Sequence, residues 1–275
     1  MPELPEVETV RIGLIDTVIG KKVLEVELIG AGRGVALEGS ELNGLEIIDV
    51  KRYGKYLMFS FSNDVSMISH LRMTGQYIHV DSRALSNLDK KGHDKHTRVL
   101  FGFSDKSGLL FNDQRKFGTM ELMNESEVDS YFASRKLGDD ALFIDYDLFL
   151  SNVSKRANVA IKTALLDQKV IAGLGNIYAI ELCYLIGVLP STLVKNLKET
   201  KLKKLYSHIA PLLLVAIKNN GTTFDGKYVT TNGEAGKFSS FLKAYGKKSC
   251  GTCGSDIVKT KLNGRGTYHC PKCQR

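Results

Sequence analysis

The chain has 275 residues, of which 43% are hydrophobic and 25% are charged. This composition excludes a disordered protein, and no apolar run approaches the roughly 18 residues that a membrane span needs. The net charge of +8 is uneven, because residues 195–275 hold sixteen Lys and Arg against four Asp and Glu. This basic segment indicates either a phosphate polymer as partner or a solubilising surface.

The first eight residues, MPELPEVE, begin a predicted helix that ends at Gly20. Removal of Met1 would expose Pro2 as a secondary amine, which can attack an aldehyde-like carbon and form an iminium. The positive end of the helix favours ionised Glu3 and Glu6 and disfavours a protonated Pro2 amine. The plainer alternative is that the prolines only start a helix and that the glutamates only complement its dipole.

Strand-like segments follow the predicted helix. Runs rich in Val, Ile, Phe, Tyr and Leu lie at 23–29, 46–61, 65–80, 97–103 and 109–112. Short turns separate them, which favours an antiparallel sandwich or barrel. Residues 82–96 are polar and irregular, so we expect a loop there.

From about residue 124 the pattern becomes helical. Asn124 and Glu127 have the spacing of a capping box. Residues 138–150 are typical of a linker or hinge. Helices are predicted at about 158–168, 176–187 and 198–219. Residues 220–237 contain four glycines among several threonines and predict a long flexible loop, which is functional or disordered in most proteins.

The cysteine spacing is the most specific pattern in the chain. Cys250 and Cys253 form one Cys-x-x-Cys pair, and Cys270 and Cys273 form a second pair sixteen residues later. Four thiolates close a tetrahedral site, so we predict one structural Zn²⁺ ion. Thiolate pairs of this kind indicate a reducing compartment, and the acidic N-terminus does not fit a signal peptide, so we expect a cytoplasmic protein.

Three further segments suggest contact with phosphates. The segments 69–75 and 112–118 place apolar Met73 and Phe117 beside cations. Apolar side chains of this kind can insert between stacked base pairs while the cations hold phosphates. The alternative is that both residues belong to the core of the sandwich. Glycines precede Asn176 at the start of a predicted helix. Backbone amides at such a position can bind phosphate, and the alternative is that Asn176 only caps the helix.

The segment Pro-Glu-Leu-Pro-Glu-Val-Glu-Thr after Met1 resembles the start of formamidopyrimidine-DNA glycosylases, the bacterial 8-oxoguanine repair enzymes. The similarity recurs in five places and covers the whole chain. It implies an α+β fold with an N-terminal antiparallel β-sandwich with flanking helices, followed by a helical helix–two-turn–helix domain that carries a zinc ribbon. The implied boundaries are 2–137 for the catalytic domain, 138–150 for the hinge, 151–246 for the helical domain with a lesion-recognition loop at 220–237, and 247–275 for the finger.

The resemblance also implies roles for individual residues. It assigns catalysis to Pro2, Glu3, Lys55 and Arg265, and support of these groups to Glu6 and His70. It assigns DNA contacts to His96, Arg115, Asn176, Met73, Phe117, Lys116 and Arg156. The match is thinner around Arg156, a Lys stands at 116 where many members have Arg, and Arg98 replaces a second family histidine.

The function implied by the resemblance is removal of oxidised purines from duplex DNA, followed by β,δ-elimination at the abasic site. We expect a monomer whose partner is double-stranded DNA with oxidised bases or abasic sites, and no membrane partner. Two alternatives remain open: an endonuclease VIII-like glycosylase for oxidised pyrimidines, and a non-catalytic zinc-ribbon protein that only binds nucleic acid. Leu4 and the segment 115–117 favour the purine enzyme.

Overall fold

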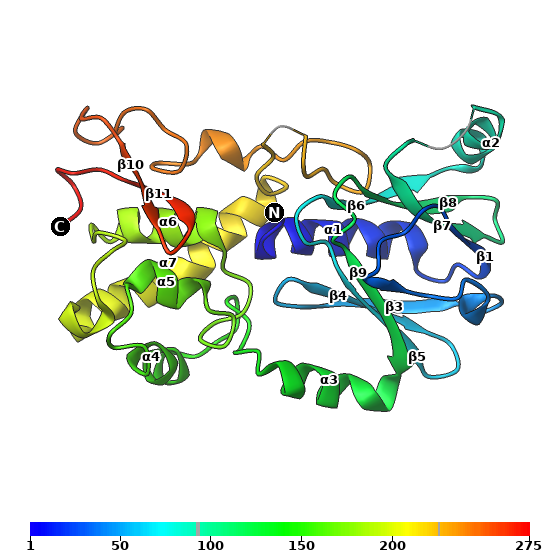
Figure 1. The fold of residues 1–275 in the computed structure, drawn as a ribbon, viewed down its shortest axis with the longest axis horizontal. Coiled ribbons are helices and arrows are strands. Elements are labelled where there is room, and N and C mark those ends of the chain that lie inside the picture. The colour runs from blue at the N-terminus through cyan, green and yellow to red at the C-terminus, as the bar shows by residue number, and fades with distance from the viewer. Residues whose placement is uncertain (92–93, 225) are drawn as a thin grey trace. The chain divides into compact units, whose positions relative to one another are not determined.

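The computed structural model describes residues 1–91, 94–224 and 226–275 (Figure 1). Residues 92, 93 and 225, which fall in the loops predicted at 82–96 and 220–237, lie outside the described residues. Contacts divide the chain into two compact units. The first comprises residues 1–134 and 219–237, and the second comprises 135–218 and 238–275. By these contacts the loop at 220–237 groups with the N-terminal unit, whereas the sequence analysis placed it within the helical domain.

The first unit contains two β-sheets. One has the strand order β1-β7-β8-β6, with β1 at Val23–Leu28, β7 at Thr97–Phe103, β8 at Gly108–Asp113 and β6 at Gly75–Val80. The other has the order β2-β9-β5-β4-β3, with β2 at Val35–Ala36, β9 at Thr119–Asn124, β5 at Val65–His70, β4 at Tyr56–Phe61 and β3 at Ile47–Tyr53. Neighbouring strands are antiparallel, apart from the short parallel pair β2–β9. The predicted antiparallel sandwich is confirmed.

Helix α1 (Leu4–Val18) belongs to the core of this sandwich and runs along β3 (Figure 1). Its apolar residues Val7, Val10 and Leu14 are fully buried against residues of both sheets. Each such side chain contributes about 1.5–3 kcal/mol of hydrophobic stabilisation. The helix ends where Gly20 takes a left-handed φ of 76°, a backbone conformation that glycine adopts without strain. Burial of α1 therefore fixes the start of the chain against the sheets.

Two elements of the first unit differ from the sequence prediction. Residues Ser82–Lys91 form α2, where we predicted a loop. Asp81 caps this helix, because its Oδ1 accepts the Ala84 N–H at 2.7 Å. Strand β9 was also missed. Its sequence TMELMN has little β-branched character, and pairing with β5 and β2 holds it in the sheet.

The second unit is helical and ends in a hairpin. Its helices are α4 (Tyr146–Ser154), α5 (Ile161–Leu166), α6 (Asn176–Leu185) and α7 (Glu199–Lys218), and α3 (Val128–Arg135) precedes it at the boundary. Strands β10 (Val258–Leu262) and β11 (Arg265–His269) form the hairpin. Short 3-10 turns lie at Ser40–Leu42, Glu125–Glu127, Val194–Asn196 and Phe238–Ser240. The helices predicted in this unit are confirmed, and α4 begins inside the segment that we predicted as a hinge. Among the described residues, no helix is both long and apolar enough to cross a membrane.

Candidate active site and DNA-binding surfaces

The N-terminus of α1 holds two buried carboxylates. The Glu3 N–H donates to Glu6 Oε2 at 2.8 Å, and the Glu3 carboxylate receives the Glu6 N–H, so the two residues form a capping box. Glu3 is 3% exposed and Glu6 is 1% exposed. Pro2 is buried beside them. The structure thus brings Pro2, Glu3 and Glu6 together at the positive end of one helix.

Burial lowers the pKa of the terminal amine, which Met1 carries in this chain. The charges of Glu3 and Glu6 oppose this shift, and those of Lys227 and Lys55 reinforce it. Two carboxylates and two lysines therefore surround the N-terminus at interacting distance. This environment favours a neutral amine, the form that acts as a nucleophile.

Lys55 lies in the turn between β3 and β4 and is 6% exposed. The preceding Gly54 has a φ of 57°, and its carbonyl accepts a hydrogen bond from Arg52 Nη1 at 3.0 Å. Arg52 Nε also donates to Glu8 Oε2 of α1 at 2.7 Å. Burial alone would raise the pKa of Glu8, but hydrogen bonds from Arg11 and Arg52 hold it below its ordinary value. A partly buried ion pair thus ties the turn that carries Lys55 to the helix that follows Glu3.

His70 ends β5 and is neutral at physiological pH. Burial, with the charges of Arg72 and Lys55, lowers the pKa of His70 to about 3. Its Nδ1 accepts the Arg72 N–H at 2.9 Å, so the ring proton lies on Nε2. Arg72 has a φ of 52°, and this hydrogen bond holds the strained turn that presents Met73. His70 therefore shapes the loop without carrying a charge.

Asp113 joins the two loops that the sequence analysis singled out. Its carboxylate is 1% exposed and accepts the hydroxyl of Thr74, the N–H of Arg115 at 3.1 Å and the N–H of Gly118 at 2.7 Å. Sequence reasoning missed this role. The available signal was an Asp at the start of a turn, a position where its side chain accepts the following backbone N–H groups.

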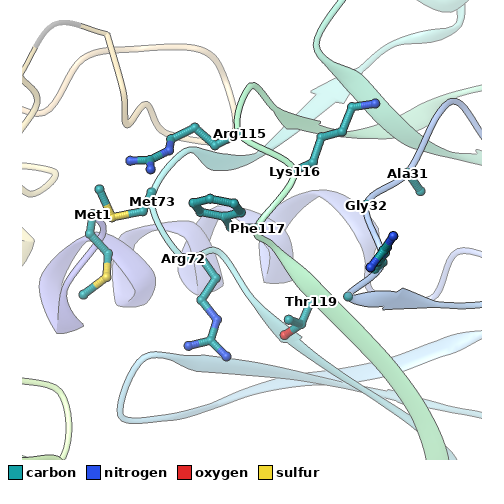
Figure 2. Close-up of a pocket in the computed structure, with 11 residues that line it drawn as sticks. Met1, Ala31, Gly32, Arg72, Met73, Arg115, Lys116, Phe117 and Thr119 are labelled. Carbon is teal, nitrogen blue, oxygen red and sulfur yellow. The ribbon is translucent and has the colours of Figure 1, made fainter.

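A cavity of about 800 Å³ opens beside these loops (Figure 2). It is lined by Met1, Ala31, Gly32, Arg33, Gly34, Arg72, Met73, Arg115, Lys116, Phe117 and Thr119. Phe117 is 52% exposed, so a place in the sandwich core is excluded for it. The Arg115 guanidinium lies 4.7 Å from the centre of the Phe117 ring. An exposed aromatic ring beside cations has the character of a wedge for a base step.

Arg33 is a cation of this cavity that sequence reasoning missed. It lies in the glycine-rich segment 30–34, which packs on the backbone of the 115–118 loop. A Cβ atom on Gly32 would lie 2.4 Å from the Lys116 carbonyl oxygen, so only glycine permits this approach. The alternation of glycines around a single Arg was the available signal.

His96 lines a smaller cavity of about 170 Å³, which Asp94, Asn112 and Lys227 also line. The His96 Nδ1 atom is buried and has no hydrogen-bond partner among the described residues. This atom is available to a ligand that enters the cavity.

The segment that follows α7 is fastened to α1. Glu6 Oε1 accepts the Thr222 N–H at 2.7 Å, and the adjacent Gly221 has a φ of 70° against the same carboxylate. Further along, Gln76 donates to the Gly226 carbonyl at 3.0 Å. Glu6 therefore links the predicted lesion-recognition loop to the backbone of Glu3.

In the second unit, Asn176 is the first residue of α6, directly after a glycine turn. Its Nδ2 donates to the carbonyl of Gly266 at 3.0 Å, next to exposed Arg265 at the start of β11. The buried Lys162 donates to Thr267 Oγ1 at 2.8 Å. Helices α5 and α6 thus hold the hairpin that presents Arg265.

The guanidinium of Arg156 is already engaged. It forms an ion pair with Asp167 in which Nη2 lies 2.6 Å from Oδ2. The phosphate contact expected of Arg156 stays a prediction and would have to compete with this carboxylate.

The four cysteines of the finger fit a zinc ion. The Sγ atoms of Cys250, Cys253, Cys270 and Cys273 all lie within 4.8 Å of one another. A tetrahedral site with Zn–S bonds of about 2.3 Å has sulfur atoms about 3.8 Å apart, and the Cys250–Cys273 distance is 3.8 Å. Cys183 is separate from this cluster, and burial raises the pKa of its thiol to about 12. The predicted structural Zn²⁺ site is confirmed in its ligand set.

Comparison with known proteins agrees with this arrangement. The family model "Formamidopyrimidine-DNA glycosylase N-terminal domain" matches residues 1–120. The model "Formamidopyrimidine-DNA glycosylase H2TH domain" matches residues 137–227, and "Zinc finger found in FPG and IleRS" matches residues 247–275.

Relatives match over their whole length. The formamidopyrimidine-DNA glycosylase of Listeria monocytogenes serotype 4b is 40% identical, and that of Streptococcus mutans serotype c is 38% identical, each over 100% of both chains. The solved structure of Lactococcus lactis Fpg with DNA containing an abasic site has a TM-score of 0.89 and 36% identity over 99% of both chains. Another Lactococcus lactis Fpg structure, with DNA containing an oxidised pyrimidine, has a TM-score of 0.89 and 36% identity over 100% of both chains. The chain belongs to the formamidopyrimidine-DNA glycosylase family.

Proposed function

We propose that this protein is a base-excision-repair glycosylase that removes oxidised purines from duplex DNA and then cleaves the strand as an abasic-site lyase. The start of α1 carries this proposal: Pro2 is buried directly beside the capping carboxylates of Glu3 and Glu6, and removal of Met1 would leave its nitrogen there as a free amine. A protein that only binds nucleic acid has no need of such an amine. Relatives named formamidopyrimidine-DNA glycosylase, matched over the full chain, support the same activity.

Removal of Met1 makes Pro2 the nucleophile. The Pro2 nitrogen attacks C1′ of the flipped nucleotide, the bond from C1′ to the base breaks, and the base leaves with its bonding electrons and a proton. The nitrogen lone pair then opens the sugar to an iminium, and Glu3 supplies the proton that O4′ or the departing base takes up. The iminium makes the C–H bonds at C2′ acidic. Loss of a proton from C2′ then expels the 3′ phosphate. A second elimination expels the 5′ phosphate, and water releases the amine.

The remaining residues hold the DNA. Met73 and Phe117 would fill the gap that the flipped base leaves, and Arg115 would contact the unpaired base opposite. Lys116, His96, Asn176 and Arg265 would bind phosphates, and Lys55 and Arg265 would also assist the eliminations. Arg33 and Arg72 add positive charge to the same cavity. A monomeric state and a cytoplasmic location stay predictions.

A second substrate class is supported by one observation. A Lactococcus lactis Fpg structure, 36% identical to this chain, contains DNA with an oxidised pyrimidine. The rates of base release from 8-oxoguanine:cytosine and thymine glycol duplexes separate the two substrate classes. Faster release of 8-oxoguanine supports the purine assignment, and faster release of thymine glycol contradicts it.

Borohydride trapping on 8-oxoguanine duplex tests the proposed chemistry. One covalent adduct is expected, and it should disappear when a non-cleavable N-terminal extension places the Pro2 nitrogen in a peptide bond. The same extension at the C-terminus is the control and should leave the adduct intact. Pro2→Gly should weaken trapping, whereas Pro5→Ala should not. Intact-mass analysis reports the loss of Met1, and full activity with Met1 retained would refute the mechanism.

A further inference from the structure

Tyr184 lies near the end of α6 and touches the zinc site. Its hydroxyl oxygen is 3.0 Å from the Sγ atom of Cys250 and 2.8 Å from the Oγ1 atom of Thr252. Cys250 is 2% exposed, whereas Thr252 is exposed. The hydroxyl therefore lies between a buried metal ligand and a solvent-facing side chain.

Metal binding sets the direction of these hydrogen bonds. Zinc takes cysteine as the thiolate, and a thiolate sulfur has no proton to donate. Tyr184 has one hydroxyl proton, so in the metal-bound protein it donates to Cys250. Thr252 then donates its own proton to the Tyr184 oxygen. The result is a chain of hydrogen bonds that runs from the protein surface to one zinc ligand.

We propose that Tyr184 is an outer-sphere residue of the zinc site that stabilises the Cys250 thiolate and so retains the metal. A hydrogen bond to an ionised acceptor is stronger than one between neutral groups. It offsets part of the negative charge that four thiolates bring to one ion. Partners of this kind orient metal ligands, and their loss typically lowers metal affinity about 10–100-fold.

The same contact fastens the finger to the helix that begins with Asn176. At the start of α6, Asn176 Nδ2 holds the Gly266 carbonyl at 3.0 Å. Near the end of α6, Tyr184 holds Cys250. The hairpin and the first cysteine pair are thereby attached to one helix at two points. Zinc retention and the placement of the 265–266 segment are linked through α6.

Zinc release from the full chain tests the proposal. Tyr184→Phe removes the hydroxyl and keeps the ring. We expect about 10–100-fold weaker zinc binding in competition with a chromophoric chelator. The control is Tyr206→Phe in the same unit, which loses a hydrogen bond to the Ile144 carbonyl of 3.1 Å and should retain zinc normally.

Cobalt substitution separates this role from a general loss of stability. The thiolate-to-cobalt charge-transfer band should shift in Tyr184→Phe, because one thiolate loses its donor, and stay unchanged in Tyr206→Phe. Thr252→Val changes an exposed position and should produce a smaller shift in the same direction, even if Tyr184→Phe fails to fold. Unchanged zinc affinity and an unchanged cobalt band in Tyr184→Phe would overturn the proposal, as would an unchanged band in Thr252→Val.

Discussion

Thr74 donates its hydroxyl proton to the carboxylate of Asp113, and this hydrogen bond joins the loop that carries Met73 to the loop that carries Phe117. Asp113 also accepts two backbone N–H groups of its own loop. The two apolar side chains proposed to enter the DNA are thus held by one buried carboxylate. Their relative placement depends on a residue that does not itself contact DNA in the proposed complex.

Asp113→Asn should lower the free energy of unfolding by about 1–3 kcal/mol, because an amide cannot accept all three hydrogen bonds and leaves a buried donor unsatisfied. Urea denaturation measures this change. Thr74→Val removes one of the three donors and should cost less. If Asp113→Asn and Thr74→Val are equally stable, the carboxylate does not organise both loops.

Phe117→Ala should leave stability within about 0.5 kcal/mol of the parent, because the ring is half exposed and outside the core. Binding to a duplex with an abasic-site analogue should weaken by about 1–3 kcal/mol through lost stacking. Fluorescence anisotropy measures the binding, and thermal unfolding measures the stability. The matched control is Phe143→Ala, whose ring is 81% exposed. Equal effects of the two changes on DNA binding would contradict the wedge.

The buried neutral His70 predicts a pH dependence of stability. Its folded pKa of about 3 lies below the unfolded value of 6.5, so only the unfolded chain takes up the proton between these values. The contribution of neutral His70 to the free energy of unfolding is fully present above pH 6.5. It is lost at up to about 1.4 kcal/mol per pH unit as the pH falls toward 3.

Comparison of His70→Gln with the parent chain, by urea denaturation at pH 7.5, 6 and 5, isolates this contribution. The difference in unfolding free energy between the two proteins should shrink as the pH falls. A constant difference across this range would show that folding does not lower the pKa of His70.

Arg265→Ala should weaken DNA binding uniformly across sequences and reduce the slope of log K against log salt by about 0.9, the value for one phosphate contact. Arg156→Ala should change the slope less, because Asp167 already offsets the charge of Arg156. Titrations at several salt concentrations measure both slopes. An unchanged slope for Arg265→Ala would remove that residue from the proposed phosphate contacts.

Several features of this protein follow from local sequence alone. The zinc ligand set depends on two Cys-x-x-Cys pairs, and each pair bends around one turn without help from the rest of the chain. The start of α1 is similarly local, because the capping box of Glu3 and Glu6 spans only three residues. Residue types at such short spacing have few alternative arrangements.

Other features required the tertiary structure. Strand β9 has a single β-branched residue, Thr119, and pairing with its neighbours β2 and β5 holds it in the sheet. Helix α2 was missed because its segment is mostly polar, and its N-terminus is capped by Asp81. The sequence by itself determined the helix spacing, the metal ligands and the family resemblance. Only the fold decided that Glu6 holds Thr222, that Asp113 joins two loops and that Tyr184 reaches Cys250. These partners are far apart along the chain, and residue type does not specify which distant group a buried polar atom will meet.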